Sequence, residues 1–174
     1  FDYVLLDFLG DVVCGGFGLP IARDMCQKVI VVASNDLQSL YVANNVCSAV
    51  EYFRRLGGNV GVAGMVVNKD DGTGEAEAFC QAVGIPQLAA IPAHEDIRRK
   101  SANYQIVGCP GSPWEPLFSE LGLNVANSPP VLPTPQGTLW KISSITALIL
   151  GLTSSTVRSV LSSRTPQLMS KPTP

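Results

Sequence analysis

Short apolar runs that each end in a polar residue, with helical stretches between them, constrain the fold of this chain most. Three such runs occupy residues 3–7, 28–34 and 60–68. Runs of this length and composition are typical of strands that are buried on both faces of a parallel sheet. Because strands and helices alternate, the pattern predicts a doubly wound α/β fold with a mostly parallel sheet and helices on both faces.

Helix signals lie between these runs. Asn35 or Asp36 can cap a helix that continues to about Leu56, where Gly57 and Gly58 end it. The further elements expected are a helix after Gly74, a strand over 87–91 and helices over 95–101 and 113–121. In such a sheet, ligands bind beyond the carboxyl ends of the strands, where this sequence places its polar residues.

Charge and composition exclude several classes of protein. The net charge of −2 and the isoelectric point near 5.3 argue against non-specific binding of nucleic acid. No apolar run approaches the roughly 18 residues of a membrane span, and no signal peptide is recognisable. Five cysteines without a CxxC pair favour a reducing, cytoplasmic location. Because the chain begins inside an apolar run, we expect it to be a fragment whose N-terminal part is missing.

The composition changes near the end of the chain. The last 39 residues hold 4 basic residues, no acidic residue and 14 Ser or Thr, whereas the first 135 hold 8 basic and 14 acidic residues. We therefore expect a folded domain over 1–132 and a Pro/Ser/Thr-rich basic tail over 133–174. The origin of the tail stays open between an amphipathic helix that contacts a membrane or partner and a foreign sequence, such as a frameshift would produce.

Asp7 opens the loop that carries most of the chemical signal. It closes an apolar run, as does the acid that many nucleoside triphosphatases use to hold Mg²⁺. Gly10 can bring its N–H close to a terminal phosphate, and Asp11 can orient the attacking water. The alternative is an ordinary carboxylate at a strand end that caps a helix.

Cys14 lies in the same loop, where four glycines occur within residues 10–18. A thiolate surrounded by free backbone N–H groups suits an iron–sulfur ligand, although a lone cysteine can equally be a small apolar residue. One cysteine cannot hold a cluster. The other four are interpreted as structural: Cys26, Cys47, Cys80 and Cys109.

The chain resembles the iron protein family of nitrogenase and of the dark-operative (bacterio)chlorophyll reductases. The resemblance covers about residues 1–132 and rests on DFLGDVVCGGFGLPI, KVIVVASNDLQSLYVANNV and GVAGMVVNKDDG. Within the family, the residues after Phe17 and the segment 35–76 are most similar to the branch that serves chlorophyllide a reduction. The resemblance implies the C-terminal portion of a deviant P-loop ATPase domain.

The resemblance also implies roles for five residues. Asp7 would be associated with the Mg²⁺ of MgATP, Gly10 would sense the γ-phosphate, and Asp11 would activate the attacking water as the catalytic acid–base group. Cys14 would be one of two cysteines that each subunit gives to a [4Fe–4S] cluster shared across a homodimer. Asn68 would hydrogen-bond the adenine.

The implied function is that of an ATP-dependent oxidoreductase component in bacteriochlorophyll biosynthesis. It would take electrons from ferredoxin and pass them at low potential to a catalytic partner that reduces chlorophyllide a. The alternatives that stay open are the iron protein of protochlorophyllide reductase or nitrogenase, a cluster-free ParA-like ATPase, and an inactive fragment.

The sequence departs from the family at its start. It contains no GxxxxGK[ST] phosphate loop, and the first cluster cysteine of the family is expected upstream. We therefore predict that the 174-residue chain alone neither hydrolyses ATP nor holds a stable cluster. Two other features have plain interpretations: His94 is expected to be an exposed loop histidine, and residues 98–100 are either a partner patch or a charged helix face.

Overall fold

The computed structural model describes residues 3–8 and 18–136 of the chain. Its elements, in chain order, are α1 (Gly18–Ala22), β1 (Lys28–Ala33), α2 (Leu37–Arg55), β2 (Gly61–Asp70), α3 (Glu75–Val83), β3 (Gln87–Pro92), α4 (Glu95–Ala102) and α5 (Glu115–Asn127). The chain divides into two units, Phe1–Pro135 and Gln136–Pro174. The elements all belong to the first unit, which is the one described here.

The three described strands form a parallel sheet in the order β1-β2-β3. β2 is the central strand, and its first seven residues are all buried. A strand covered on both faces needs apolar side chains on both, which explains its continuous run of small and apolar residues. The predicted parallel sheet is therefore confirmed.

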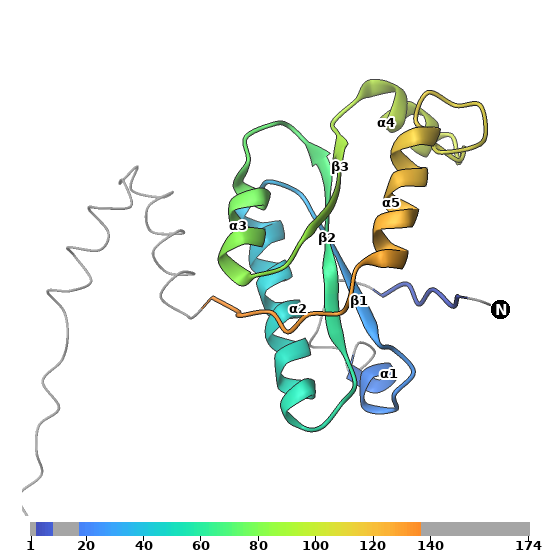
Figure 1. The fold of residues 1–174 in the computed structure, drawn as a ribbon. Coiled ribbons are helices and arrows are strands. Elements are labelled where there is room, and N and C mark those ends of the chain that lie inside the picture. Colours follow the sequence, from blue (N-terminus) through green and yellow to red (C-terminus); the bar gives the residue numbers. More distant parts are fainter. Residues whose placement is uncertain (1–2, 9–17, 137–174) are drawn as a thin grey trace, which may run out of the picture. The chain divides into compact units, whose positions relative to one another are not determined.

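Helices cover both faces of this sheet. α2 and α3 lie on one side of it, and α5 lies on the other (Figure 1). Asn124 of α5 donates a hydrogen bond to the backbone oxygen of Leu88 in β3 at 2.9 Å. The strands pair in parallel, and the isolated bridge between Val62 of β2 and Val131 is antiparallel. The pairing is therefore mostly parallel. This architecture is the α/β fold that the sequence predicts, and it agrees with the deviant P-loop type.

The longest helix, α2, has the start and end that the sequence predicts. Asp36 is its N-cap, and the Asp36 carboxylate accepts a hydrogen bond from the backbone N–H of Ser39 at 2.8 Å. After Arg55 the chain leaves the helix through Gly57, whose φ of +94° favours glycine. One face of α2 packs against β1 and β2 with its buried residues: Leu40, Ala43, Asn44, Val46, Cys47 and Val50.

The remaining elements lie close to their predicted positions, with small differences at the ends. α5 begins two residues later and ends six residues later than predicted, and the short helix α1 is absent from the sequence prediction. In the described ranges, no helix combines the length and the apolar character needed to cross a membrane.

The prediction of a buried strand over residues 3–7 is wrong. The described residues of this segment have no regular secondary structure, and Tyr3, Val4 and Leu5 are 74%, 75% and 84% exposed. A strand forms only where a neighbour completes its ladder of backbone hydrogen bonds, and no described strand pairs with this segment. An apolar run is therefore not sufficient to make a strand here.

Candidate functional site

Polar residues that follow β1 and β3 meet the end of β2 at the carboxyl edge of the sheet. Ala33 pairs with Val67, and Asn68 pairs with Ile91, so the residues after these positions share one edge. The sequence places Ser34 and Asn68 at this edge, and the structure confirms both positions.

Asn68 presents an amide with spare hydrogen-bonding capacity. Its Oδ1 accepts a hydrogen bond from the backbone N–H of Lys69 at 3.0 Å, and the side chain is half-buried. Among the described residues, Nδ2 donates to no other group. Asn68 can therefore offer both Nδ2 hydrogens and a second lone pair of Oδ1 to a ligand.

Lys69 makes the chain turn sharply at this point. The backbone pairing skips Lys69 between Asn68 and Asp70, which is a bulge, and Lys69 has a φ of +54°. A left-handed conformation costs a residue with a side chain about 1–2 kcal/mol. Bulges and strained residues concentrate near functional sites, where they redirect side chains. The turn separates Asn68 from the acidic residues that follow it.

A pocket of about 120 Å³ opens beside Asn68. Its lining residues come from β1, the start of α2 and the end of β2: Val32, Ala33, Ser34, Ser39, Asn68 and Lys69. Pockets that bury a whole drug-sized ligand have volumes of roughly 300–1,000 Å³. This pocket therefore suits one part of a nucleotide rather than all of it.

Asp36 organises the hydroxyl groups beside that pocket. The Ser34 hydroxyl donates to the Asp36 carboxylate, and the backbone N–H of Ser34 donates to the Ser39 hydroxyl at 3.0 Å. The hydrogen bond from Ser34, followed by the one from the Ser39 backbone, lowers the pKa of Asp36. The carboxylate is thus ionised at neutral pH and holds the start of α2 against the end of β1.

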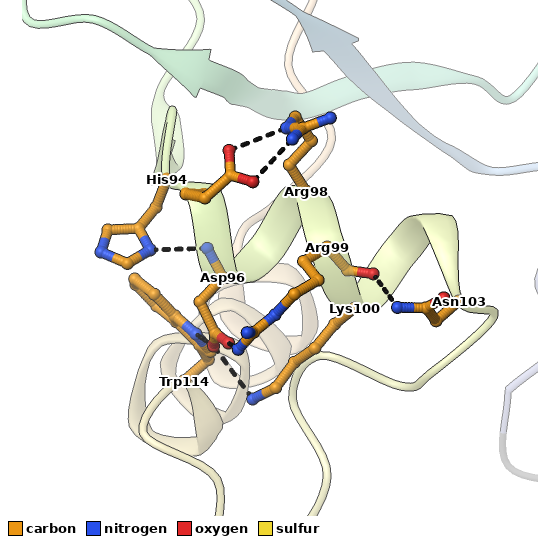
Figure 2. A network of polar contacts seen from close by, with 8 residues as sticks. His94, Asp96, Arg98, Arg99, Lys100, Asn103 and Trp114 are labelled. Atoms are coloured by element: carbon orange, nitrogen blue, oxygen red, sulfur yellow. Dashed lines mark hydrogen bonds and ion pairs between the residues drawn. The ribbon is translucent and has the colours of Figure 1, made fainter.

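A second group of polar residues lies after β3, on the segment that leads into α4. Figure 2 shows the His94 ring accepting a hydrogen bond at Nδ1 from the backbone N–H of Asp96, at 3.1 Å. His94 is exposed, as predicted, and it is the N-cap of α4. Its ring also meets the Trp114 indole edge-on, with 4.9 Å between centroids. The start of α4 is therefore held by the His94 ring, through its hydrogen bond at Nδ1 and its contact with Trp114.

Asp96 is the centre of this second group, and no pattern in the sequence indicates its role. Its carboxylate accepts from Nε1 of Trp114 at 2.9 Å and contacts Arg99 at 3.0 Å and Lys100 at 3.1 Å (Figure 2). The bond from Trp114 is the main cause that lowers the pKa of Asp96 far below its usual range, followed by Lys100 and Arg99. Arg98 pairs with Glu95. All three basic residues of 98–100 therefore have partners on their own helix.

The remaining predicted site residues are not brought to this edge by any described contact. Asp7 lies in the exposed segment before residue 9, and no described residue forms a hydrogen bond or ion pair with it. Gly10, Asp11 and Cys14 lie outside the described residues.

Four cysteines lie in the described ranges, and all four are free. Cys47 and Cys80 are buried, as expected of packing residues, whereas Cys26 is half-exposed and Cys109 is exposed. Within residues 3–8 and 18–136, no three His, Cys, Asp or Glu side chains are grouped as metal ligands.

The free groups of the Asn68 amide are of the kind that pair with an adenine base. Adenine has a donor at N6 beside an acceptor at N7, and an asparagine amide can pair with both. Asn68 has the matching donor and acceptor free, at the carboxyl edge where parallel sheets bind nucleotides. The phosphate and cluster residues of the prediction, Gly10 and Cys14, are outside the described part.

The chain is similar to several known proteins. The chain is 77% identical over 135 residues to the "Chlorophyllide reductase 35.5 kDa chain" of Cereibacter sphaeroides and to that of Rhodobacter capsulatus, covering 78% of this chain and 40% of each relative. It is 39% identical over 104 residues to the "Light-independent protochlorophyllide reductase iron-sulfur ATP-binding protein" of Chlorobium luteolum, covering 57% of this chain and 37% of that protein. The chain spans about two fifths of the length of these relatives.

Residues 1–146 match the family described as "4Fe-4S iron sulfur cluster binding proteins, NifH/frxC family". The match includes the whole described part of the chain and the segment that contains Cys14. The chain therefore belongs to the NifH/frxC family of iron–sulfur cluster binding proteins.

Proposed function

We propose that this chain is the C-terminal portion of the ATP-dependent iron–sulfur component of chlorophyllide a reductase. The observation that carries the proposal is the identity of 77% to chlorophyllide reductase chains, against 39% to the protochlorophyllide reductase protein. The component would donate low-potential electrons to a catalytic partner that holds chlorophyllide a, as a step of bacteriochlorophyll biosynthesis.

MgATP would be bound at two places along the chain. Asn68 would hold the adenine, and the free amide at the sheet edge supports this role. Asp7 would hold the Mg²⁺ through its water shell, Gly10 would contact the γ-phosphate through its N–H, and Asp11 would accept a proton from the attacking water. The segment after Pro92 would cover the base.

Cys14 would be one ligand of a [4Fe–4S] cluster shared by two copies of the chain. The cluster, when bound, supplies single electrons at low potential. Gly10 and Cys14 are four residues apart in the sequence. A change of phosphate state at Gly10 would therefore move Cys14 and the docking face together, which couples ATP hydrolysis to electron transfer.

The partners that follow from this role are a second copy of the chain, a catalytic heteromeric partner and ferredoxin as electron donor. Nucleic acid is not among them, because the chain carries a net charge of −2. Free cysteines among the described residues support a cytoplasmic location. Residues 1–132 would form part of the ATPase domain, with the tail over 133–174 outside it.

A hybrid protein tests the assigned residues. In the hybrid, the residues of this chain that align with the 35.5 kDa chain of C. sphaeroides replace their counterparts in that protein. We expect the hybrid to bind one [4Fe–4S] cluster per dimer and to hydrolyse MgATP. Cys14→Ser should remove the iron, while the matched control Cys26→Ser should retain it, because Cys26 is held by the Lys28 carbonyl.

Asp11→Asn separates chemistry from binding in the same hybrid. Loss of a general base costs about 10²–10⁴-fold in rate, so hydrolysis should fall by that factor while MgATP binding is retained. Iron that remains in Cys14→Ser, or hydrolysis that is unchanged in Asp11→Asn, would contradict the assignment. A hybrid that binds MgATP but never iron would favour the ParA-like alternative.

A further inference from the structure

Asn35 is a nearly buried polar residue at the carboxyl end of β1, where it joins three segments of the chain. It is 9% exposed, and every hydrogen-bonding group of its amide is used. Nδ2 donates to Oδ1 of Asp70 at 2.8 Å and to Oδ1 of Asp71 at 2.6 Å. Oδ1 accepts from the backbone N–H of Ala76 at 3.0 Å. A buried amide with all its partners in place fixes the geometry of each of them.

One of these bonds replaces a missing helix cap. The N-cap of α3 is Gly74, which has no side chain to accept from the first N–H groups of the helix. Asn35 accepts from Ala76, whose residue is fully buried, and so caps α3 from a different element. The connection between β2 and α3 is therefore closed by Asn35, two residues after the end of β1.

The other two bonds hold the turn immediately after Asn68. Asp70 accepts from Asn35 with its side chain and from the backbone N–H of Ala93 with its carbonyl oxygen, at 2.9 Å. Asp70 thus joins Asn35, two residues after β1, to the segment after Pro92, which would cover the base. Only Lys69, in its left-handed conformation, separates Asp70 from Asn68. Asp70 therefore lies two residues from Asn68 in the same strand, β2.

We infer that Asn35 is a positioning residue for the purine base: by clamping Asp70 and Asp71, it sets the orientation of Asn68 and of the segment after Pro92. The inference deepens the proposed function and rests on the proposal that Asn68 binds adenine. Asn35 itself does not contact the nucleotide. Its effect on binding passes through the turn over residues 70–74.

Asn35→Asp tests this role with almost no change of shape. The new carboxylate can still accept from Ala76, but it faces Asp70 and Asp71 with acceptors only. Asp71 is ionised, because hydrogen bonds from the Thr73 hydroxyl and then from Asn35 lower its pKa. Like charges should therefore open the turn. The matched control is Asn124→Asp, which loses the single bond to Leu88 at a place remote in the chain from Asn68.

The readout is the dissociation constant of the hybrid for MgATP and for MgITP, whose base has an oxygen in place of the N6 amino group. We expect Asn35→Asp to raise the dissociation constant for MgATP about tenfold and so to bring it close to that for MgITP. The reason is that losing the oriented pair of hydrogen bonds between Asn68 and the base costs about a factor of ten in affinity. Asn124→Asp should leave the preference for adenine unchanged. If Asn35 had only a structural role, Asn35→Asp would weaken the binding of MgATP and of MgITP by the same factor.

The exchange Asn35→Asp with Asp71→Asn provides a second variant if the single one does not fold. It reverses donor and acceptor, so the pair can reform and recover part of the preference for MgATP. An unchanged ratio of the two constants in Asn35→Asp and in the double variant would overturn the inference while leaving the proposed function intact. If the unsubstituted hybrid bound no MgATP, the proposed function would fail first, and the inference with it.

Discussion

The indole Nε1–H of Trp114 donates a hydrogen bond to Oδ2 of Asp96 at 2.9 Å and joins the start of α5 to the first turn of α4 (Figure 2). α4 has no buried residue, so it lacks the apolar contacts that hold most helices in place. Its position depends on this bond and on the edge contact between His94 and Trp114. The segment after Pro92 is therefore held by polar contacts.

Trp114→Phe should make the protein less sensitive to acid as well as less stable. The pKa of Asp96 is lower in the folded state than its ordinary value of 3.8, so its contribution to stability is present above about pH 4 and is lost as the pH falls further. Without the indole donor, the pKa of Asp96 in the folded state rises, and the loss of stability at low pH becomes smaller. Urea unfolding between pH 2.5 and 7, with points about every half unit, measures the free energy of unfolding at each pH.

Tyr104→Phe is the control for that experiment, because Tyr104 is 99% exposed. It should reproduce the curve of the unsubstituted chain. If the stability of Trp114→Phe ran parallel to that of the unsubstituted chain across the acid range, the Trp114 hydrogen bond would not lower the pKa of Asp96.

The protein should lose stability in alkali because of two buried thiols. Burial, and then the nearby Cys80, raises the pKa of Cys47 to about 12, and burial, followed by Glu77, raises that of Cys80 to about 11, from 9.0. From about pH 9 to about pH 11 these thiols ionise mainly in the unfolded chain, so the free energy of unfolding falls as the pH rises, by at most about 1.4 kcal/mol per pH unit for each thiol. Unfolding of Cys47→Ala should show a flatter alkaline slope, whereas exposed Cys109→Ala should not. Equal alkaline slopes in the unsubstituted chain, Cys47→Ala and Cys109→Ala would contradict a raised pKa of the Cys47 thiol.

Gly64→Ala should destabilise the fold strongly, since Gly64 lies in the central strand with a φ of +153°. A Cβ there would be 2.6 Å from the backbone oxygen of Pro86 and 2.7 Å from Cγ of Leu88. Overpacking and strain together should cost about 3 kcal/mol. Gly122→Ala, in α5 with nothing within 4 Å, should stabilise by about 0.5–1 kcal/mol. Thermal unfolding that ranks the two variants the other way would refute this account of β2.

The purified 174-residue chain should show no ATP hydrolysis above background and should retain no iron. Its sequence has no GxxxxGK[ST] run to hold the phosphates, and Cys14 alone cannot ligate a cluster. The hybrid serves as the positive control in both assays. Hydrolysis by the chain alone would show that another part of it binds the phosphates.

The sheet and its helices could be predicted because their signals are local. The apolar runs that became β1 and β2 end in polar residues, and Pro92 closes β3. Asp36 supplies a cap for α2, and Gly57 marks its end. The position of Asn68 followed from the topology alone, since the ends of neighbouring parallel strands share an edge.

The contacts that organise the site could not be predicted in the same way. Asn35 reaches Asp70 across 35 residues of chain, and Trp114 reaches Asp96 across 18. Such bonds depend on the packed arrangement of β1, β2, α4 and α5, and no local pattern marks them. The prediction of a strand over residues 3–7 was wrong for a similar reason. A strand needs a neighbouring strand, and the composition of the run does not show whether one is present.

Reduction of chlorophyllide a by the hybrid tests the central claim most directly. The hybrid would be combined with the other chains of the C. sphaeroides reductase, MgATP and reduced ferredoxin, and the loss of chlorophyllide a would be followed by absorbance. The account predicts reduction that requires MgATP, is abolished in Cys14→Ser, and does not occur with protochlorophyllide. No reduction of chlorophyllide a by a hybrid that holds its cluster and binds MgATP would contradict it.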